Sequence, residues 1–154
     1  MVKDIESGGI ALFLDFDGVL HSANDAVLDA NGRLLKNGQH FEWLPLLVTV
    51  LAPFSDVGII VSSDWRRLFD DNALVKLLGP LGPRFVGVVE TSQRRGLAGW
   101  LALDDHPSVV KAGKKDGRFV ACEPDTGFSS LTVQAELRQK LGHLQQGLPI
   151  IRRR

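Results

Sequence analysis

The chain has 154 residues, of which 44% are hydrophobic and 23% are charged, as in an ordinary globular domain. Its 18 basic and 18 acidic residues cancel, which excludes a global positive field that would make nucleic acid or an anionic membrane an obligatory partner. The single cysteine excludes an intramolecular disulfide and a cysteine-rich zinc site. We expect one cytoplasmic domain over residues 1–154, without a membrane span or an obligatory protein partner, in which any metal serves chemistry rather than folding.

The first half of the chain predicts two buried strands and two helices. Residues 10–14 and 57–61 are short, continuous apolar runs, which are typical of strands buried on both faces. Apolar residues recur at helical spacing over residues 41–52, and residues 65–78 predict a second helix that ends before Gly79 and Pro80. The polar stretch 21–40 predicts a loop or small flap over the strand ends.

The second half continues the alternation. Residues 85–89, 100–103 and 118–122 predict three further strands, and residues 132–144 predict a closing amphipathic helix. Alternating strands and helices favour a mostly parallel sheet with helices on both faces, that is, an α/β fold.

Polar side chains follow three of these strands. Ligands of such sheets bind outside the carboxyl ends of the strands, so these side chains are predicted to converge at one edge. The residues are Asp15 and Asp17 after the first strand, Ser62 and Ser63 after the second, and Asp104 and Asp105 after the fourth.

This residue set suits the hydrolysis of a phosphate ester. A carboxylate that attacks a phosphate must overcome a repulsion of about 4 kcal/mol per pair of unit charges at about 4 Å and an effective dielectric near 20. Mg²⁺ offsets such repulsion and binds through oxygen ligands, which Asp15, Asp104 and Asp105 supply, with a backbone carbonyl near Asp17 as a fourth. Asp15 is then the predicted nucleophile, and Asp17 the acid and base that serves the leaving oxygen and the water.

Other residues are predicted to contact the phosphate. Gly18 allows the chain to turn closely around it, and the Ser62 hydroxyl, with Ser63 and N–H groups at a helix start, can bind its oxygens. Arg66 could hold a phosphate or a base, and Arg94 or Arg95 could neutralise the remaining negative charge.

Several residues carry weaker signals. His21 and His106 lie near the predicted site, but a loop histidine is usually a surface residue. Trp65 could hold a base, although packing is the more ordinary role for a tryptophan, and Cys122 is interpreted as inert core. Residues 152–154, three arginines, are interpreted as a solvated tail, with contact to nucleic-acid phosphates as the alternative.

The motifs resemble the haloacid dehalogenase-like (HAD) superfamily over nearly the whole chain. Asp15-Phe-Asp-Gly18 is similar to its first motif, Ser62 to its second, and Asp104-Asp105 to its acidic pair. The stretches from Phe13 to His21 and from Ile60 to Arg66 resemble a compact subgroup associated with RNA or DNA end repair. The resemblance implies a Rossmann-like three-layer α/β/α sandwich with strand order 5-4-1-2-3, and the short spacings imply that no large cap is present.

Two points stay open within the resemblance. The basic residue of the third motif has no clear counterpart, and Arg95 is favoured over Arg94 and Lys76. Residues 91–100 leave little room for a helix before the fourth strand. Residues 118–125 could therefore supply that strand, with Glu123 and Asp125 as acidic ligands, although the junction at Asp104 is favoured.

The predicted function is that of a Mg²⁺-dependent phosphatase acting on a phosphorylated small molecule or a nucleic-acid end. A catalytically degenerate HAD-like binding module and a nucleic-acid-binding domain are the alternatives. A receiver domain is disfavoured, because it requires a lysine after the fifth strand, where this chain has Cys122-Glu-Pro-Asp125.

Overall fold

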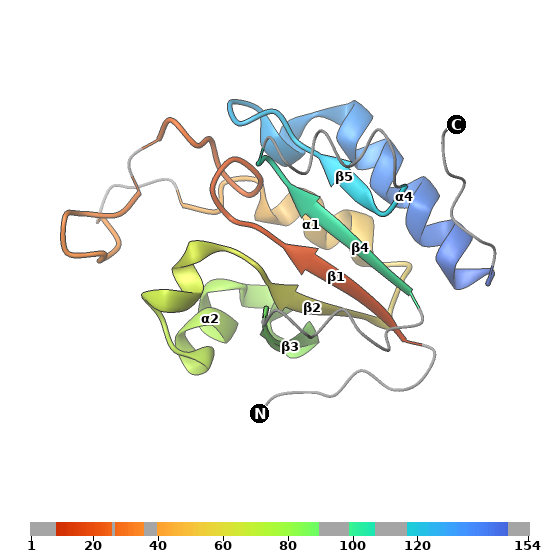
Figure 1. Ribbon diagram of the computed structural model, residues 1–154, viewed down its shortest axis with the longest axis horizontal. Coiled ribbons are helices and arrows are strands. Elements are labelled where there is room, and N and C mark those ends of the chain that lie inside the picture. Colours follow the sequence, from red (N-terminus) through yellow and green to blue (C-terminus); the bar gives the residue numbers. More distant parts are fainter. Residues whose placement is uncertain (1–8, 26, 36–39, 90–98, 107–116, 148–154) are drawn as a thin grey trace.

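A computed structural model describes residues 9–25, 27–35, 40–89, 99–106 and 117–147. Its centre is a five-stranded parallel sheet in the order β3-β2-β1-β4-β5 (Figure 1). The strands are β1 (Ile10–Leu14), β2 (Val57–Val61), β3 (Phe85–Val88), β4 (Gly99–Asp104) and β5 (Phe119–Ala121). This is the predicted α/β fold with the predicted strand order.

The central position of β1 follows from its sequence. All five residues of β1 are buried, and β1 pairs in register with β2 on one side and β4 on the other. A strand with two neighbours and two covered faces has no position for a polar side chain, and IALFL contains none. Leu14 lies beside Val61 and Leu103, so the residues that follow these three strands start at one edge.

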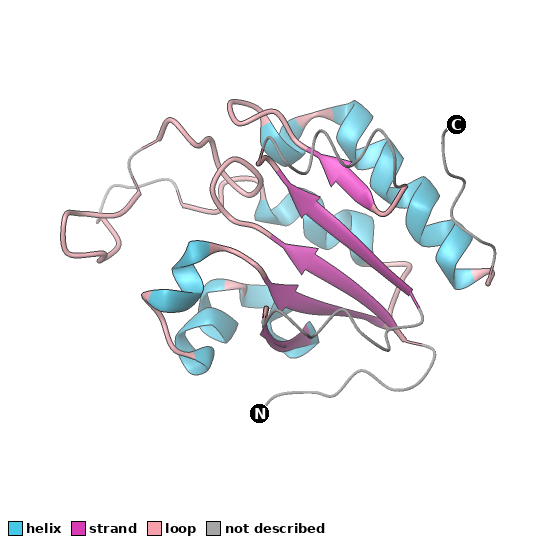
Figure 2. Cartoon of the chain, in the orientation of Figure 1, coloured by secondary structure: helices cyan, strands magenta, loops and turns pink. Residues whose placement is uncertain are grey.

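The described residues also form the helices α1 (Leu44–Leu51), α2 (Asp71–Leu77) and α4 (Leu131–Gln145) (Figure 2). All three contribute buried leucines to one large apolar cluster, which also contains Leu12 and Leu14 of β1. Ala11 and Phe13, on the opposite face of β1, belong to a second, smaller cluster. The crossovers after β3 and β4, where the second helix layer and the short crossover were predicted, lie largely outside the described residues.

The prediction of one continuous helix over residues 65–78 is wrong. The segment forms a 3-10 helix, η1 (Asp64–Arg67), and then the separate helix α2. The break has a local cause, because the Asp70 side chain accepts a hydrogen bond from the Ala73 N–H at 2.8 Å and starts a new helix there. The short η1 keeps Trp65 close to the carboxyl end of β2.

Arg84 stabilises the end of the fold opposite the carboxyl edge. It lies in the 3-10 helix η2 (Gly79–Arg84), and its guanidinium donates hydrogen bonds of 2.7 to 3.1 Å to three backbone carbonyls. These carbonyls, at the end of α1 and in the turn into β2, belong to Leu51, Phe54 and Val57. One side chain thus joins α1, β2 and the start of β3.

The described residues of the predicted flap, 21–25 and 27–35, form a loop that leaves the carboxyl edge of the sheet, seen in orange in Figure 1. Its base is tied to the loop after β5, because the Ala23 N–H donates to the Pro124 carbonyl at 2.9 Å and Asn24 to the Asp125 carboxylate. Its tip turns at Asp29, which accepts from the Arg33 N–H at 3.0 Å. In the described part of the chain no helix is both long and apolar enough to cross a membrane.

Candidate active site

Three strand ends meet at the carboxyl edge of the sheet. The Asp15 N–H donates to the Leu103 carbonyl at 3.1 Å, and the Ser62 N–H donates to the Leu14 carbonyl at 2.9 Å. These bonds extend the pairing of β1 one step beyond its end on both sides. The first residues after β1 and β2 and the last residue of β4 therefore lie side by side, as predicted.

A cluster of carboxylates occupies this point. One oxygen each of Asp15, Asp104 and Asp105 lies within 4.8 Å of the others, and all three side chains are partly buried. Burial first, and then the neighbouring Asp104 and Asp105, raise the pKa of Asp15 to about 9. Burial also raises the pKa of Asp105. Three acidic groups are thus crowded together, and burial with this crowding suppresses the ionisation of Asp15.

The donor set fits Mg²⁺. Among the described residues it consists of carboxylate oxygens, without a sulfur or imidazole ligand, at a separation that one hard cation can bridge. A divalent charge would also offset the repulsion by Asp104 and Asp105, which adds to burial in raising the pKa of Asp15. The residues present therefore match the ion that the sequence predicted.

The alternative ligand set is wrong. Residues 99–104 form the strand beside β1, whereas β5 lies at the sheet edge, so the junction at Asp104 is the one next to Asp15. Glu123 and Asp125 are exposed, and neither belongs to the cluster.

Gly18 makes room for the cluster. It has φ +76°, a conformation that side chains other than hydrogen disfavour, and a β-carbon at this position would overlap the Asp105 carboxylate. From the sequence, Gly18 is predicted to let the chain turn closely around a phosphate. The structure gives it a second reason to be glycine, which is to let the segments after β1 and β4 touch.

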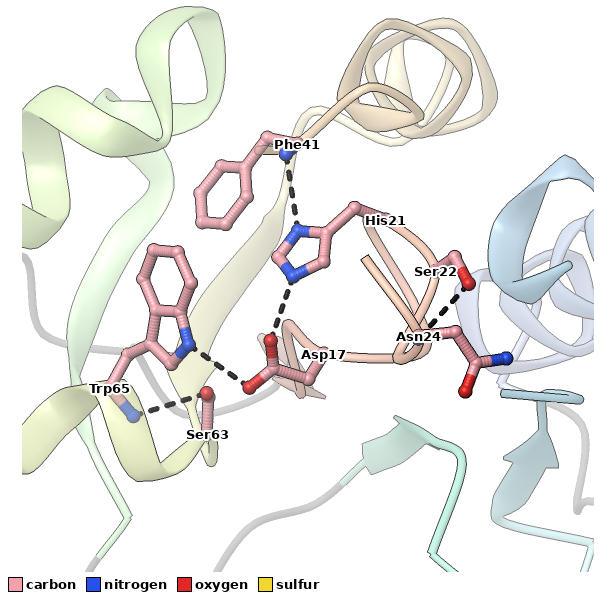
Figure 3. Close-up of polar contacts among 7 residues, drawn as sticks. All are labelled: Asp17, His21, Ser22, Asn24, Phe41, Ser63 and Trp65. Carbon is pink, nitrogen blue, oxygen red and sulfur yellow. Dashed lines mark hydrogen bonds and ion pairs between the residues drawn. The ribbon is translucent and has the colours of Figure 1, made fainter. Parts of the chain in front are cut away.

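Asp17 lies outside this cluster, and Figure 3 shows its hydrogen-bond partners. Its Oδ1 accepts a hydrogen bond from His21 Nε2 at 2.7 Å, and its Oδ2 accepts one from Trp65 Nε1 at 3.0 Å. The Asp17 side chain is half exposed, whereas those of His21 and Trp65 are buried. With both side-chain oxygens engaged, any contribution of Asp17 to a metal would rest with its backbone carbonyl.

His21 is not the surface residue that sequence reasoning expected. Its side chain is fully buried, and its Nδ1 accepts a hydrogen bond from the Phe41 N–H at 3.2 Å. The histidine follows two apolar residues, Val19 and Leu20, which signals that this part of the loop turns inward. His106, by contrast, is exposed, as expected of a loop residue.

The structure describes some of the residues that were predicted to contact a phosphate or to supply the basic group. Ser62 stands at the strand edge, partly exposed, whereas Ser63 is buried and its hydroxyl accepts from the Trp65 N–H at 3.2 Å. Arg66 donates to the Ser62 and Ser63 carbonyls at 3.3 and 2.9 Å, so it braces this turn. Lys76 lies on α2 and is exposed. Arg94, Arg95 and the tail 152–154 lie outside the described residues.

Cys122 is buried at the end of β5, and burial raises the pKa of its thiol above the ordinary value. The thiol is therefore protonated and unreactive, which agrees with a place in the core.

Comparison with known families identifies the family of this chain. Residues 11–133, well over half of the chain, match the family model described as the HAD domain in Swiss Army Knife RNA repair proteins. Searches of curated proteins and of solved structures each found no significant match. The match contains four of the five residues of β1, the flap, the carboxylate cluster and both partners of Asp17. This chain belongs to the family of HAD domains found in Swiss Army Knife RNA repair proteins.

Proposed function

We propose that this protein is a Mg²⁺-dependent phosphomonoester hydrolase that acts through an aspartyl-phosphate on Asp15. The observation that carries the proposal is the contrast between two carboxylates two residues apart. Asp15 lies in an acidic cluster that fits a cation, and Asp17 is held outside that cluster by two N–H donors. A nucleophile and a separate acid and base are the two roles that hydrolysis by a covalent intermediate requires.

In the first step, an Asp15 oxygen attacks the phosphorus, and the bond from phosphorus to the leaving oxygen breaks. The leaving oxygen takes a proton from the Asp17 carboxyl. In the second step, water attacks the phosphorus and gives its proton to Asp17, which restores the Asp15 carboxylate and releases inorganic phosphate. Mg²⁺ bound by Asp15, Asp104 and Asp105 would supply positive charge that keeps the carboxylates ionised and offsets their repulsion of the phosphate.

We propose a nucleotide or a phosphorylated nucleic-acid end as the substrate. Membership in a family named for RNA repair supports a nucleic-acid end, since repair requires phosphates to be removed from broken termini. The short spacings in the sequence support it as well, because they leave no room for a large cap, and a site without one admits a substrate that remains attached to a larger molecule. A phosphorylated small molecule is the alternative that the same chemistry allows.

Release of phosphate from an aryl phosphate, with and without Mg²⁺, tests the activity. We expect Mg²⁺-dependent turnover that Asp15→Asn abolishes and that Asp71→Asn, an exposed carboxylate on α2, leaves unchanged. An Asp15→Asn protein with full activity would rule out the nucleophile. A folded wild-type protein without turnover on any substrate would favour a binding module instead.

A panel of substrates tests the proposal that the substrate is a nucleotide or a nucleic-acid end. It compares 5′- and 3′-phosphorylated RNA and DNA oligonucleotides, nucleoside monophosphates and sugar phosphates at equal concentration. Preference for oligonucleotide ends, expressed as kcat/KM, would support the nucleic-acid assignment, and preference for sugar phosphates would contradict it.

A further inference from the structure

We propose that His21 and Trp65 are positioning residues for Asp17, which they hold in the orientation from which its carboxyl exchanges a proton with the leaving oxygen and with water. This inference rests on the proposed function. The two donors come from separate parts of the chain, the loop after β1 and the 3-10 helix after β2, and each binds a different oxygen of the carboxylate. A carboxylate held at both oxygens cannot rotate about its terminal bond without losing a hydrogen bond.

The Phe41 backbone determines the tautomer of His21. The Phe41 N–H donates to Nδ1, so that nitrogen carries no proton, and in the neutral ring the proton is on Nε2, which faces Asp17. If Nδ1 carried a proton, its N–H would point at the Phe41 N–H, and two donors would meet without an acceptor. His21 is therefore maintained as a hydrogen-bond donor toward Asp17.

The hydrogen bond from Phe41 to His21 is made by a residue with an unusual backbone conformation. Its φ is +58°, which bulky residues rarely adopt, and it is the only non-glycine residue with positive φ among those described. The turn directs the Phe41 N–H at the buried imidazole, while the Trp43 N–H donates to the Leu20 carbonyl at 2.8 Å and ties the same turn to the loop.

Aromatic packing holds the two donors in place. The Phe41 ring stacks on His21 with a centroid distance of 5.8 Å and on Trp65 with 5.3 Å, and Phe16 meets Trp65 edge to face at 5.5 Å. His21 and Trp65 are themselves 5.7 Å apart. The donors are thus fixed relative to each other as well as to Asp17.

The same geometry argues against a proton relay through His21. A relay needs a second exchange partner, but the far nitrogen of His21 meets a peptide N–H, and the ring is fully buried. Asp17, which is half exposed, is the member of the trio that can reach a substrate. His21 and Trp65 therefore act through Asp17.

A positioning role has a kinetic signature that simple packing lacks. An aryl phosphate with an acidic leaving group needs no proton to depart, whereas an alkyl phosphate does. If His21 and Trp65 position the acid, their loss should slow the first step on an alkyl phosphate far more than on the aryl phosphate. Asp17 also serves as the base in the second step. If it is misplaced, hydrolysis of the aspartyl-phosphate should slow, and the intermediate should accumulate.

Trp65→Phe removes the indole N–H and keeps an aromatic ring. With 4-nitrophenyl phosphate and Mg²⁺ we expect a rapid burst of nitrophenol close to one equivalent of enzyme, followed by turnover at least about tenfold slower than in the wild type. The ratio of kcat/KM for 4-nitrophenyl phosphate to that for a nucleoside 5′-monophosphate should rise by about tenfold or more. Phe69→Leu is the matched control, because Phe69 packs on Trp65 at 5.6 Å and is not one of the two donors to Asp17.

A pair of His21 variants separates the donor from the rest of the ring. His21→Gln can place an amide N–H near Nε2, and His21→Asn can place an acceptor near Nδ1 but no donor toward Asp17. We expect Gln to preserve the substrate ratio better than Asn does.

The outcomes distinguish the two proposals. If the folded wild type shows no Mg²⁺-dependent turnover, the proposed function falls, and the positioning role falls with it. If the wild type is active but folded Trp65→Phe and His21→Asn keep the wild-type ratio without a burst, only the positioning role falls. An equal change of the ratio in Phe69→Leu would likewise overturn it in favour of packing.

Discussion

Asp15→Asn should stabilise the metal-free protein in a pH-dependent way. The pKa of Asp15 is raised from 3.8 to about 9 in the fold, chiefly by burial and then by Asp104 and Asp105. Between these values the folded protein holds a proton that the unfolded chain releases. The free energy of unfolding of the wild type therefore falls as pH rises through this window, whereas the amide of the variant has no proton to lose.

The size of the effect follows from the same pKa values. pH 7 lies about 3 units above the ordinary pKa of 3.8, and each pH unit in this range lowers the stability of the wild type by about 1.4 kcal/mol. The free energy of unfolding of the variant should therefore exceed that of the wild type by up to about 4 kcal/mol. For a chain of this length that is roughly 10 °C in melting temperature. Near pH 4 the gain should almost vanish, because both forms then lack a charge at this position.

Thermal unfolding in chelator, from pH 4 to 9, measures this difference. When Mg²⁺ replaces the chelator, it should stabilise the wild type more than the variant, because a cation at about 100 times its Kd contributes about 2.7 kcal/mol to the stability of a protein that binds it. The exposed Asp71→Asn should follow the wild type throughout. A gain for Asp15→Asn that stays constant across this pH range, or a loss at neutral pH, would refute the reasoning.

Three further changes test the site and the fold separately. Gly18→Ala should lower kcat/KM by about 100-fold or more, because its β-carbon displaces the Asp105 carboxylate, and phosphate release measures the loss. Asp104→Asn should weaken Mg²⁺ binding by about tenfold or more, as judged by calorimetry or by the Mg²⁺ dependence of turnover. Arg84→Met should cost about 2–3 kcal/mol in urea unfolding and leave the activity of the folded fraction intact, since it removes three hydrogen bonds to backbone carbonyls away from the cluster.

The sheet was predictable because its strands are uninterrupted apolar runs. The bounds of β1 and β2 agree with prediction, since each run is stopped abruptly by a polar residue, Asp15 or Ser62. The helix after β2 was overextended for the opposite reason. Apolar spacing continues from Trp65 through Leu78, and only the capping role of Asp70 reveals that the chain stops and restarts.

The carboxylate cluster could be anticipated from topology, because parallel strands bring their carboxyl ends to one edge wherever they lie in the sequence. The partners of Asp17 could not. Which nitrogen of His21 faces inward depends on a bond from Phe41, 20 residues away, and the indole of Trp65 reaches Asp17 only because η1 turns it toward the loop. Neither feature has a periodicity or spacing that would predict it.

The placement of Asp15 and Asp17 shows how one short segment can supply two chemically different carboxylates. Asp15 continues the line of the central strand into the strand junction, where the segment after β4 brings Asp104 and Asp105 beside it. Two residues later the chain has begun the turn that Gly18 completes, and Asp17 faces the loop and the aromatic cluster instead. Acidic neighbours give the first site a set of ligands that fits a cation, whereas two N–H donors give the second a fixed direction without one. Removing the metal should therefore disturb Asp15 and leave the hydrogen bonds of Asp17 in place, which is the separation of roles that a covalent mechanism needs.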